Sequence, residues 1–168
     1  DHGLTMAKIA GAISEAVDAA EGGIQSMLDD AAMAVMTLNG GSAVPLWNTW
    51  LDGLQEEAPE GEEIDVAGLK AIFAKALEEL EDMSGAKVGD KTMMDALIPA
   101  SEAVAAYTGD SADELFDAAA QAAAQGAEAT KQYVSKFGRA KSYGTKTIGT
   151  PDAGAVSMSW FFQGLARE

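Results

Sequence analysis

The sequence predicts an all-α protein, and three observations support that prediction. Apolar residues recur at spacings of three and four, most clearly where one buried stripe joins Val66, Leu69, Phe73, Ala76, Leu77 and Leu80. Glycines and capping residues separate the periodic stretches at short intervals. No stretch shows the alternation of a convincing strand. Because helices joined by short loops become antiparallel neighbours, we expect an up-and-down bundle.

Seven helical segments are expected, with helix-capping residues included in their ranges: 3–20, 24–38, 42–54, 65–84, 90–107, 111–136 and 153–166. Ser42, Asp65 and Asp90 are expected to cap the third, fourth and fifth segments. An acidic connection covers 55–63, and a glycine-punctuated loop covers 137–152. The loops after the second, fourth and sixth helices, together with the start of the chain, are expected to share one end of the bundle.

Composition limits the class of protein. The 168 residues form one domain of ordinary hydrophobic content, 48%, with no cysteine for disulfides or thiolate zinc sites. The net charge of −16 disfavours nucleic acid and anionic membranes as partners. No apolar run approaches the roughly 20 residues of a membrane span, and the first residues do not resemble a secretory signal. The sequence therefore predicts a single cytoplasmic domain over 1–168.

Two glycine turns are candidates for holding an anion. Gly40-Gly41-Ser42 precedes a helix and reads either as a phosphate loop or as a helix stop followed by a cap. The segment 89–92 has the same ambiguity: Asp90 suits a cap, whereas Lys91 and Thr92 suit an anion. Both readings stay open on spacing alone.

A basic cluster and a lone histidine complete the candidate chemistry. Five of the eleven basic residues fall within sixteen positions: Lys131, Lys136, Arg139, Lys141 and Lys146. The cluster is either a solvated helix end or an anion-binding edge, in which Arg139 could pair with phosphate oxygens. His2 is the sole histidine and builds no hydrolase triad. The acidic end of the bundle suits Mg²⁺.

Four motifs in this order resemble the L subunit of the dihydroxyacetone kinase family across essentially the whole chain. They are Asp1-His2-Gly3-x-x-Met6, Gly40-Gly41-Ser42, Gly89-Asp90-Lys91-Thr92-Met93-x-Asp95-Ala96-Leu97-x-Pro99, and Gly138-Arg139-Ala140 followed by Ile148-Gly149-x-x-Asp152-x-Gly154-Ala155. The third motif is the most specific.

The resemblance implies an eight-helix antiparallel barrel that binds ADP or ATP with two Mg²⁺. Seven helices are expected here, so the resemblance implies that an N-terminal helix is missing. Of three aspartates in the family's metal motif, only Asp1 has a counterpart, and the other two are expected upstream. By the same resemblance, the chain as given should bind Mg-nucleotide weakly or not at all.

The resemblance also assigns nucleotide contacts by position. The implied cofactor-binding residues are His2, Gly3, Thr5, Ser42, Ala43, Gly85, Thr92, Met93, Arg139 and Asp152, with Asp1 as metal ligand. Met93 would lie against the adenine, and Arg139 is the one candidate for a catalytic, phosphate-positioning role.

The resemblance implies a glycerone-kinase-type phosphotransferase that needs a partner. A K-type subunit or domain would hold the ketose, and the donor is either ATP or a bound ADP rephosphorylated by a phosphotransferase-system subunit. Ser42-Ala43-Val44 lacks the family's second hydroxyl, and 139–144 departs from its usual closing loop, which suggests another short-chain ketose such as a tetrulose. The alternatives are a regulatory or scaffold module of the same fold and a fatty-acid-kinase-like domain.

Overall fold

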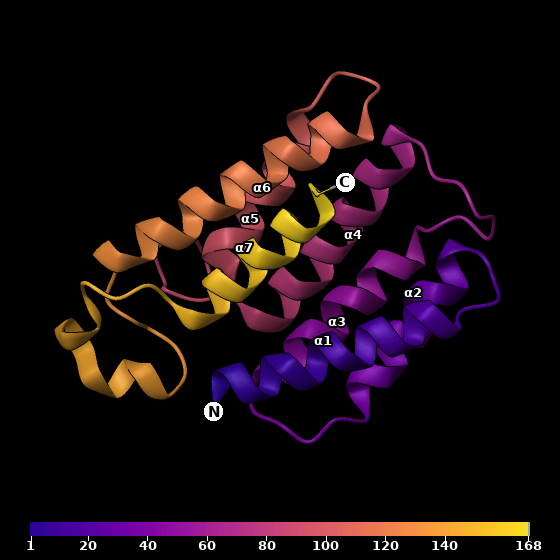
Figure 1. Ribbon diagram of the computed structural model, residues 1–168. Helices are drawn as coiled ribbons and strands as arrows, with labels where there is room; N and C mark the ends of the chain where they lie inside the picture. Colours follow the sequence, from indigo (N-terminus) through magenta and orange to yellow (C-terminus); the bar gives the residue numbers. More distant parts are fainter. Residues whose placement is uncertain (168) are drawn as a thin grey trace. The chain divides into compact units, whose positions relative to one another are not determined.

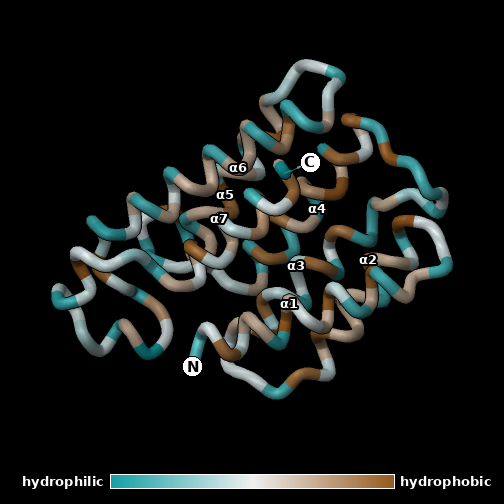
Figure 2. Tube along the Cα trace, in the orientation of Figure 1, coloured by the Kyte–Doolittle hydropathy of each residue, from teal (hydrophilic) through white to brown (hydrophobic). Residues whose placement is uncertain are grey.

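The computed structural model describes residues 1–167, which are helical as predicted and contain no strand (Figure 1). Seven α-helices form, as expected: α1 (His2–Ala19), α2 (Ile24–Met36), α3 (Ala43–Glu56), α4 (Val66–Ser84), α5 (Met94–Ala106), α6 (Ala112–Ala129) and α7 (Ala153–Leu165). Along each helix the tube in Figure 2 alternates between hydrophobic and hydrophilic residues, as amphipathic helices require. The contacts divide the chain into two compact units, residues 1–84 and residues from Gly85 onward.

The first unit packs α1 to α4 in chain order, since α2 contacts α1 and α3, and α4 contacts α3. An aromatic cluster fills its core: Trp47 meets Trp50 edge-on with ring centroids 5.6 Å apart, and Trp50 lies 6.1 Å from Phe73. A Cβ added at Gly53 would lie 2.6 Å from the Cα of Ala76. The absence of a side chain at this position therefore lets α3 and α4 approach closely.

The second unit packs α6 against both α5 and α7, and α5 also contacts α7. Small residues of α6 make this approach possible. A Cβ added at Gly126 would lie 2.0 Å from the carbonyl oxygen of Asp95 at the start of α5. Two 3₁₀ segments follow α6, at Thr130–Gln132 and Arg139–Thr147, and the second is broken at Gly144, whose φ is 54°.

Two helix starts agree with the prediction. The Oδ1 of Asp65 accepts a hydrogen bond from the N–H of Gly68 at 2.7 Å, and Ser111 accepts from the N–H of Glu114 at 3.3 Å. Ser42 occupies the N-cap position of α3, although in the described structure its side chain makes no capping bond. Its hydroxyl therefore is not committed to satisfying the first turn of α3.

Two other predictions about helix ends were wrong. Asp90 does not cap the fifth helix, which begins only at Met94, because its carboxylate accepts from the N–H of Lys87 and from the Nζ of Lys136. The sixth helix ends at Ala129 rather than near 136. There the hydroxyl of Thr130 donates to the carbonyl of Ala127, and the chain turns into the 3₁₀ segment. Among residues 1–167, no helix has the length and apolar character that a membrane span needs.

Candidate functional site

In the first unit, the start of α1 lies beside the glycine turn that precedes α3. The N–H and hydroxyl of Thr5 both donate to the carbonyl of Asp1, at 3.1 and 3.2 Å. A Cβ added at Gly40 would lie 2.9 Å from the Cγ2 of Thr5 and 2.7 Å from that of Val44. Glycine at position 40 is therefore what allows the turn to reach the first turn of α1.

The predicted phosphate contacts of this unit are accessible. Gly3, Gly41 and Ser42 are exposed, and His2 and Ala43 are half-buried. A Cβ added at Gly3 or Gly41 would meet no atom within 4 Å, so space is open at both backbones. The first turn of α3 directs its main-chain N–H groups toward the residues that precede it, which is the usual setting for anion binding at a helix start.

Asp1 is the predicted metal ligand, and it is exposed at the start of α1. Within residues 1–167, no group of three or more His, Cys, Asp or Glu side chains is placed to hold a metal ion. Mg²⁺ in proteins is commonly held by one or two carboxylates together with substrate phosphates and water. A Mg²⁺ bound at Asp1 would therefore need phosphates and water as its further ligands.

In the second unit, the turn of residues 89–92 is held by carboxylates. We call it the GDKT turn. The side chain of Asp95, only 1% exposed, accepts hydrogen bonds from the N–H of Gly89 at 2.6 Å and of Thr92 at 2.7 Å. Gly89 and Lys91 both adopt positive φ, at 95° and 63°. Asp95 was in the sequence motif without an assigned role, because its partners follow from the shape of the turn and not from residue type.

Asp90 anchors the same turn to the chain beyond α6. Its carboxylate accepts from the N–H of Lys87 at 2.8 Å and from the Nζ of Lys136 at 2.6 Å. These two bonds lower the pKa of Asp90 below its usual value, and the bond from Lys136 has the larger effect. The carbonyl of Asp90 also accepts from the N–H of Lys136, at 3.1 Å.

Lys91 points into the interior and does not face solvent. Its side chain is 4% exposed, and its Nζ donates to the carbonyls of Thr130 at 2.6 Å and Thr150 at 2.5 Å. From the sequence, Lys91 was a candidate to donate hydrogen bonds to an anion. In the structure its amine instead donates to main-chain carbonyl oxygens.

Thr92, Met93 and Asp152 lie near one another in this unit. The hydroxyl of Thr92 accepts from the N–H of Met94 at 3.1 Å, and the side chain is half-buried. A Cβ added at Gly154 would lie 3.3 Å from that of Met93, so Met93 packs against the start of α7. Asp152 is the N-cap of that helix, and its Oδ2 accepts from the N–H of Ala155 at 2.9 Å.

Two members of the basic cluster form ion pairs with acidic residues. Lys131 pairs with Glu128 and Lys136 pairs with Asp90, each at 2.6 Å. Arg139, Lys141 and Lys146 are exposed on the second 3₁₀ segment, which begins after Gly138 at a φ of 60°. Gly85, also at positive φ, is exposed directly after α4.

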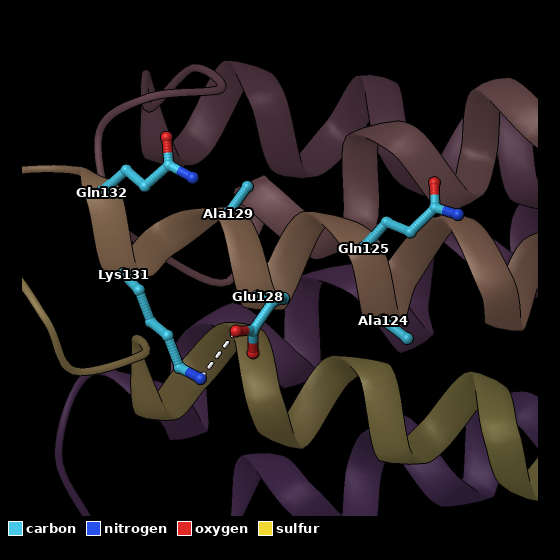
Figure 3. Close-up of a pocket in the computed structure, with 6 residues that line it drawn as sticks. All are labelled: Ala124, Gln125, Glu128, Ala129, Lys131 and Gln132. Atoms are coloured by element: carbon cyan, nitrogen blue, oxygen red, sulfur yellow. Dashed lines mark hydrogen bonds and ion pairs between the residues drawn. The ribbon is translucent and has the colours of Figure 1, made fainter.

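An open pocket of about 580 Å³ lies elsewhere on this unit, at the end of α6. Figure 3 shows its lining, which is Ala124, Gln125, Glu128, Ala129, Lys131 and Gln132. None of the predicted nucleotide contacts lines it. Within each unit, then, several predicted residues do lie together, while the expectation that all four segments meet at one end of a single domain stays a prediction.

Known proteins resemble the chain over nearly its full length. It is 35% identical to an L-erythrulose kinase of Pectobacterium atrosepticum and 35% identical to a D-erythrulose kinase of Mycolicibacterium smegmatis, over 99% and 95% of this chain. It is 29% identical to the PEP-dependent dihydroxyacetone kinase 1, ADP-binding subunit DhaL, of Listeria innocua, over 99% of this chain and 80% of that protein.

A solved structure, the dihydroxyacetone kinase of C. freundii in its native form, aligns with a TM-score of 0.62 at 25% identity, covering 84% of this chain and 23% of that one. The chain spans 29% and 28% of the lengths of the two erythrulose kinases. It matches the DAK2 domain family over residues 1–167. A match of this extent, on an all-helical fold with the motifs in place, shows that the chain belongs to the DAK2 domain family.

Proposed function

We propose that this chain is the nucleotide-binding module of a kinase, a single L-type domain that binds ADP or ATP with Mg²⁺ and takes part in phosphoryl transfer to a short-chain ketose. The observation that carries the proposal is the match to the Listeria protein, which is named for ADP binding and is covered over most of its own length. The glycine turn at Gly40–Ser42 supports it, because its residues are exposed directly before the start of α3.

The phosphates would be bound in the first unit by the turn at Gly40–Ser42 and by Thr5. Three observations support this assignment. Ser42 has an uncommitted hydroxyl before α3, the backbone at Gly41 is open, and Gly40 admits Thr5 to the same place. Gly3, His2 and Ala43 flank these groups and would complete the contacts. A helix start and small residues together favour a bound phosphate over an aromatic or apolar ligand.

Asp1 would hold Mg²⁺ together with the phosphates. When bound, the ion would neutralise charge on the transferring phosphoryl group. The chain's own contribution is the carboxylate of Asp1, and the net charge of −16 makes such a cation important for binding any polyanion.

In the second unit, the residues proposed to contact nucleotide are Thr92, Met93 and Arg139, together with Gly85 and Asp152. Met93 is 5% exposed, so a contact with adenine would require the residues that cover it to move apart, whereas Arg139 is exposed and offers a guanidinium for phosphate oxygens. Asp152 would contribute indirectly, because its capping bond fixes the start of α7 next to Met93.

A K-type subunit or domain would present the ketose, and a hydroxyl of the sugar would take the terminal phosphoryl group, leaving ADP. In the alternative cycle, bound ADP would be rephosphorylated by a phosphotransferase-system subunit. Among the ketoses we favour a four-carbon sugar, because two erythrulose kinases are each 35% identical to this chain.

Calorimetric titration of the full gene product with ADP tests the proposal, once with Mg²⁺ and once with EDTA. We expect Mg²⁺-dependent binding that weakens in Ser42→Ala, which removes the hydroxyl of the phosphate turn. The matched control is Ser14→Ala, which removes an exposed hydroxyl from the middle of α1. Equal affinity in Ser42→Ala and Ser14→Ala would place the phosphates elsewhere, and no binding by the wild type would reject the kinase function.

A further inference from the structure

Lys91 is the most deeply buried lysine of the GDKT turn and its neighbourhood, and the function proposed above gives it no task. At 4% exposure its amine is not available to a ligand from solvent. Burying a lysine is costly unless its amine is hydrogen-bonded, and here it donates to two carbonyls 39 and 59 positions along the chain. Such long-range bonds indicate that Lys91 joins segments and does not serve its own turn.

The backbone at Lys91 supports the same interpretation. Its φ of 63° lies in the left-handed region, which residues other than glycine, asparagine and aspartate rarely adopt. Lysine is a poor choice for a turn of this shape unless its side chain has a separate role. The left-handed conformation is the one in which this side chain reaches Thr130 and Thr150.

The two acceptors of Lys91 lie at opposite ends of one segment. Thr130 is the C-cap of α6, where the helix dipole places partial negative charge, so a lysine amine is favoured there. Thr150 lies two residues before Asp152, the N-cap of α7. We call residues 130–152 the closing segment, since it runs from the end of α6 to the start of α7 and includes Arg139.

Further bonds tie the two ends of the closing segment to each other. The N–H of Asp152 donates to the hydroxyl of Thr130 at 2.8 Å, and the N–H of Gly149 donates to the carbonyl of Lys131 at 2.7 Å. Thr130 is fully buried. Lys91, Thr130 and Asp152 therefore form one connected chain of hydrogen bonds from the GDKT turn to the start of α7.

From this geometry we infer that Lys91 is a positioning residue: by bonding both ends of the closing segment it holds that segment against the GDKT turn, in the arrangement that the nucleotide requires. Its importance for binding rests on the proposed function, while the positioning itself does not. Lys91 acts through Thr92, Met93 and Arg139, which it keeps in register, and does not contact the ligand.

The test compares Lys91→Met, which keeps the length of the side chain and removes the amine, with wild type. The matched control is Lys87→Met, which removes an exposed positive charge from the same loop. Hydrogen exchange of the Gly149 and Asp152 amides reports on the closing segment, and calorimetry with Mg-ADP reports on binding. Both are measured at a temperature where circular dichroism shows every variant to be folded.

We expect Lys91→Met to speed exchange at both amides and to weaken Mg-ADP about tenfold, the loss typical of residues that orient a binding site from behind it. Lys87→Met should change neither. A residue that contributes only to overall stability would lower the midpoint of thermal unfolding without changing the affinity of the folded protein. Unchanged exchange at Gly149 and Asp152 in folded Lys91→Met would overturn the inference.

The absence of cysteine allows a rescue experiment. Lys91→Cys, alkylated with 2-bromoethylamine in denaturant and then refolded, regains an amine at nearly the length of lysine. Slow exchange and tight binding should return after alkylation, and their failure to return would count against the amine. Should Lys91→Met not fold, Thr130→Val breaks the next link, the acceptor of the Asp152 N–H, and is expected to have the same two effects.

The two proposals fail separately. Wild-type protein that binds no Mg-ADP would reject the proposed function, and the exchange measurements would still decide whether Lys91 holds the closing segment. If wild type and folded Lys91→Met bind Mg-ADP equally tightly, the kinase function stands and the inference that Lys91 supports binding is rejected.

Discussion

Single carboxylates decide the shape of the turn at 85–95. Asp95 binds two main-chain N–H groups, and Asp90 binds one N–H group and the amine of Lys136. Both side chains are largely shielded from water, with 1% and 9% exposure. An N–H group left without its acceptor in such a place costs free energy of folding, so these two residues contribute differently from the other, mostly exposed, acids of the chain.

Asp95→Asn tests the first of these contributions. The amide keeps one oxygen but turns an NH₂ group toward an N–H that needs an acceptor. We expect the free energy of unfolding to fall by about 2 kcal/mol, because hydrogen bonds to a charged acceptor are stronger than neutral ones. Urea unfolding measures the change. Asp117→Asn, at an exposed position of α6, should stay close to wild type, and a similar loss in both variants would contradict the role of Asp95.

Lys136→Met tests the second contribution through its dependence on pH. The pKa of Asp90 is lowered in the folded state, chiefly by the bond to Lys136. The folded state therefore gains stability above the unfolded pKa of Asp90, near 4, and loses it as the pH falls through the lower folded value.

The destabilisation caused by Lys136→Met should accordingly be present at pH 7 and shrink toward pH 3. It should stay below about 1 kcal/mol, since the lysine end of the pair is exposed. Thermal unfolding at several pH values measures it against Lys141→Met, whose lysine lies exposed on the second 3₁₀ segment. A difference from wild type that grows as the pH falls would have the wrong sign.

At the scale of helices, close approach depends on particular glycines. Gly126→Ala places a Cβ 2.0 Å from the carbonyl oxygen of Asp95. The backbone cannot move away cheaply, so we expect a loss of about 2 kcal/mol, in the range for overpacked cores. Gly11→Ala in α1 meets no atom within 4 Å and should instead stabilise by about 0.5 kcal/mol. Chemical unfolding of both variants checks the contrast, and equal effects would contradict it.

The helices themselves were predictable from sequence because their causes are local. Asp65 caps α4 by accepting from the N–H three positions ahead. The apolar stripe of α4 follows from the three- and four-residue spacing of its apolar side chains. The start of α5 and the end of α6 were not predictable, because long-range bonds set them. Asp90 pairs with a lysine 46 positions away, and the C-cap carbonyl of α6 accepts from Lys91. Residue types near a boundary do not reveal such partners.

For the candidate site, the close approach of Gly40 to Thr5 agrees with the expected grouping within the first unit, while the nucleotide contacts assigned from the motifs stay predictions. The motif did not reveal which residues hold the turns in shape. Asp95 and Lys91 are polar residues within a specific motif, yet their side chains point inward, and only the three-dimensional arrangement separates them from Thr92, whose side chain is half-buried.

At the scale of the whole molecule, the central claim is the proposed binding of a Mg-nucleotide by this chain. Hydrogen exchange of the full gene product, with and without Mg-ADP, tests it most directly. We predict slower exchange in two separate segments, at residues 40–44 before and within α3 and at residues 89–94 in the GDKT turn, and no slowing in the middle of α1. Two results would contradict the account: Mg-ADP that binds without slowing exchange in either segment, and Mg-ADP that does not bind.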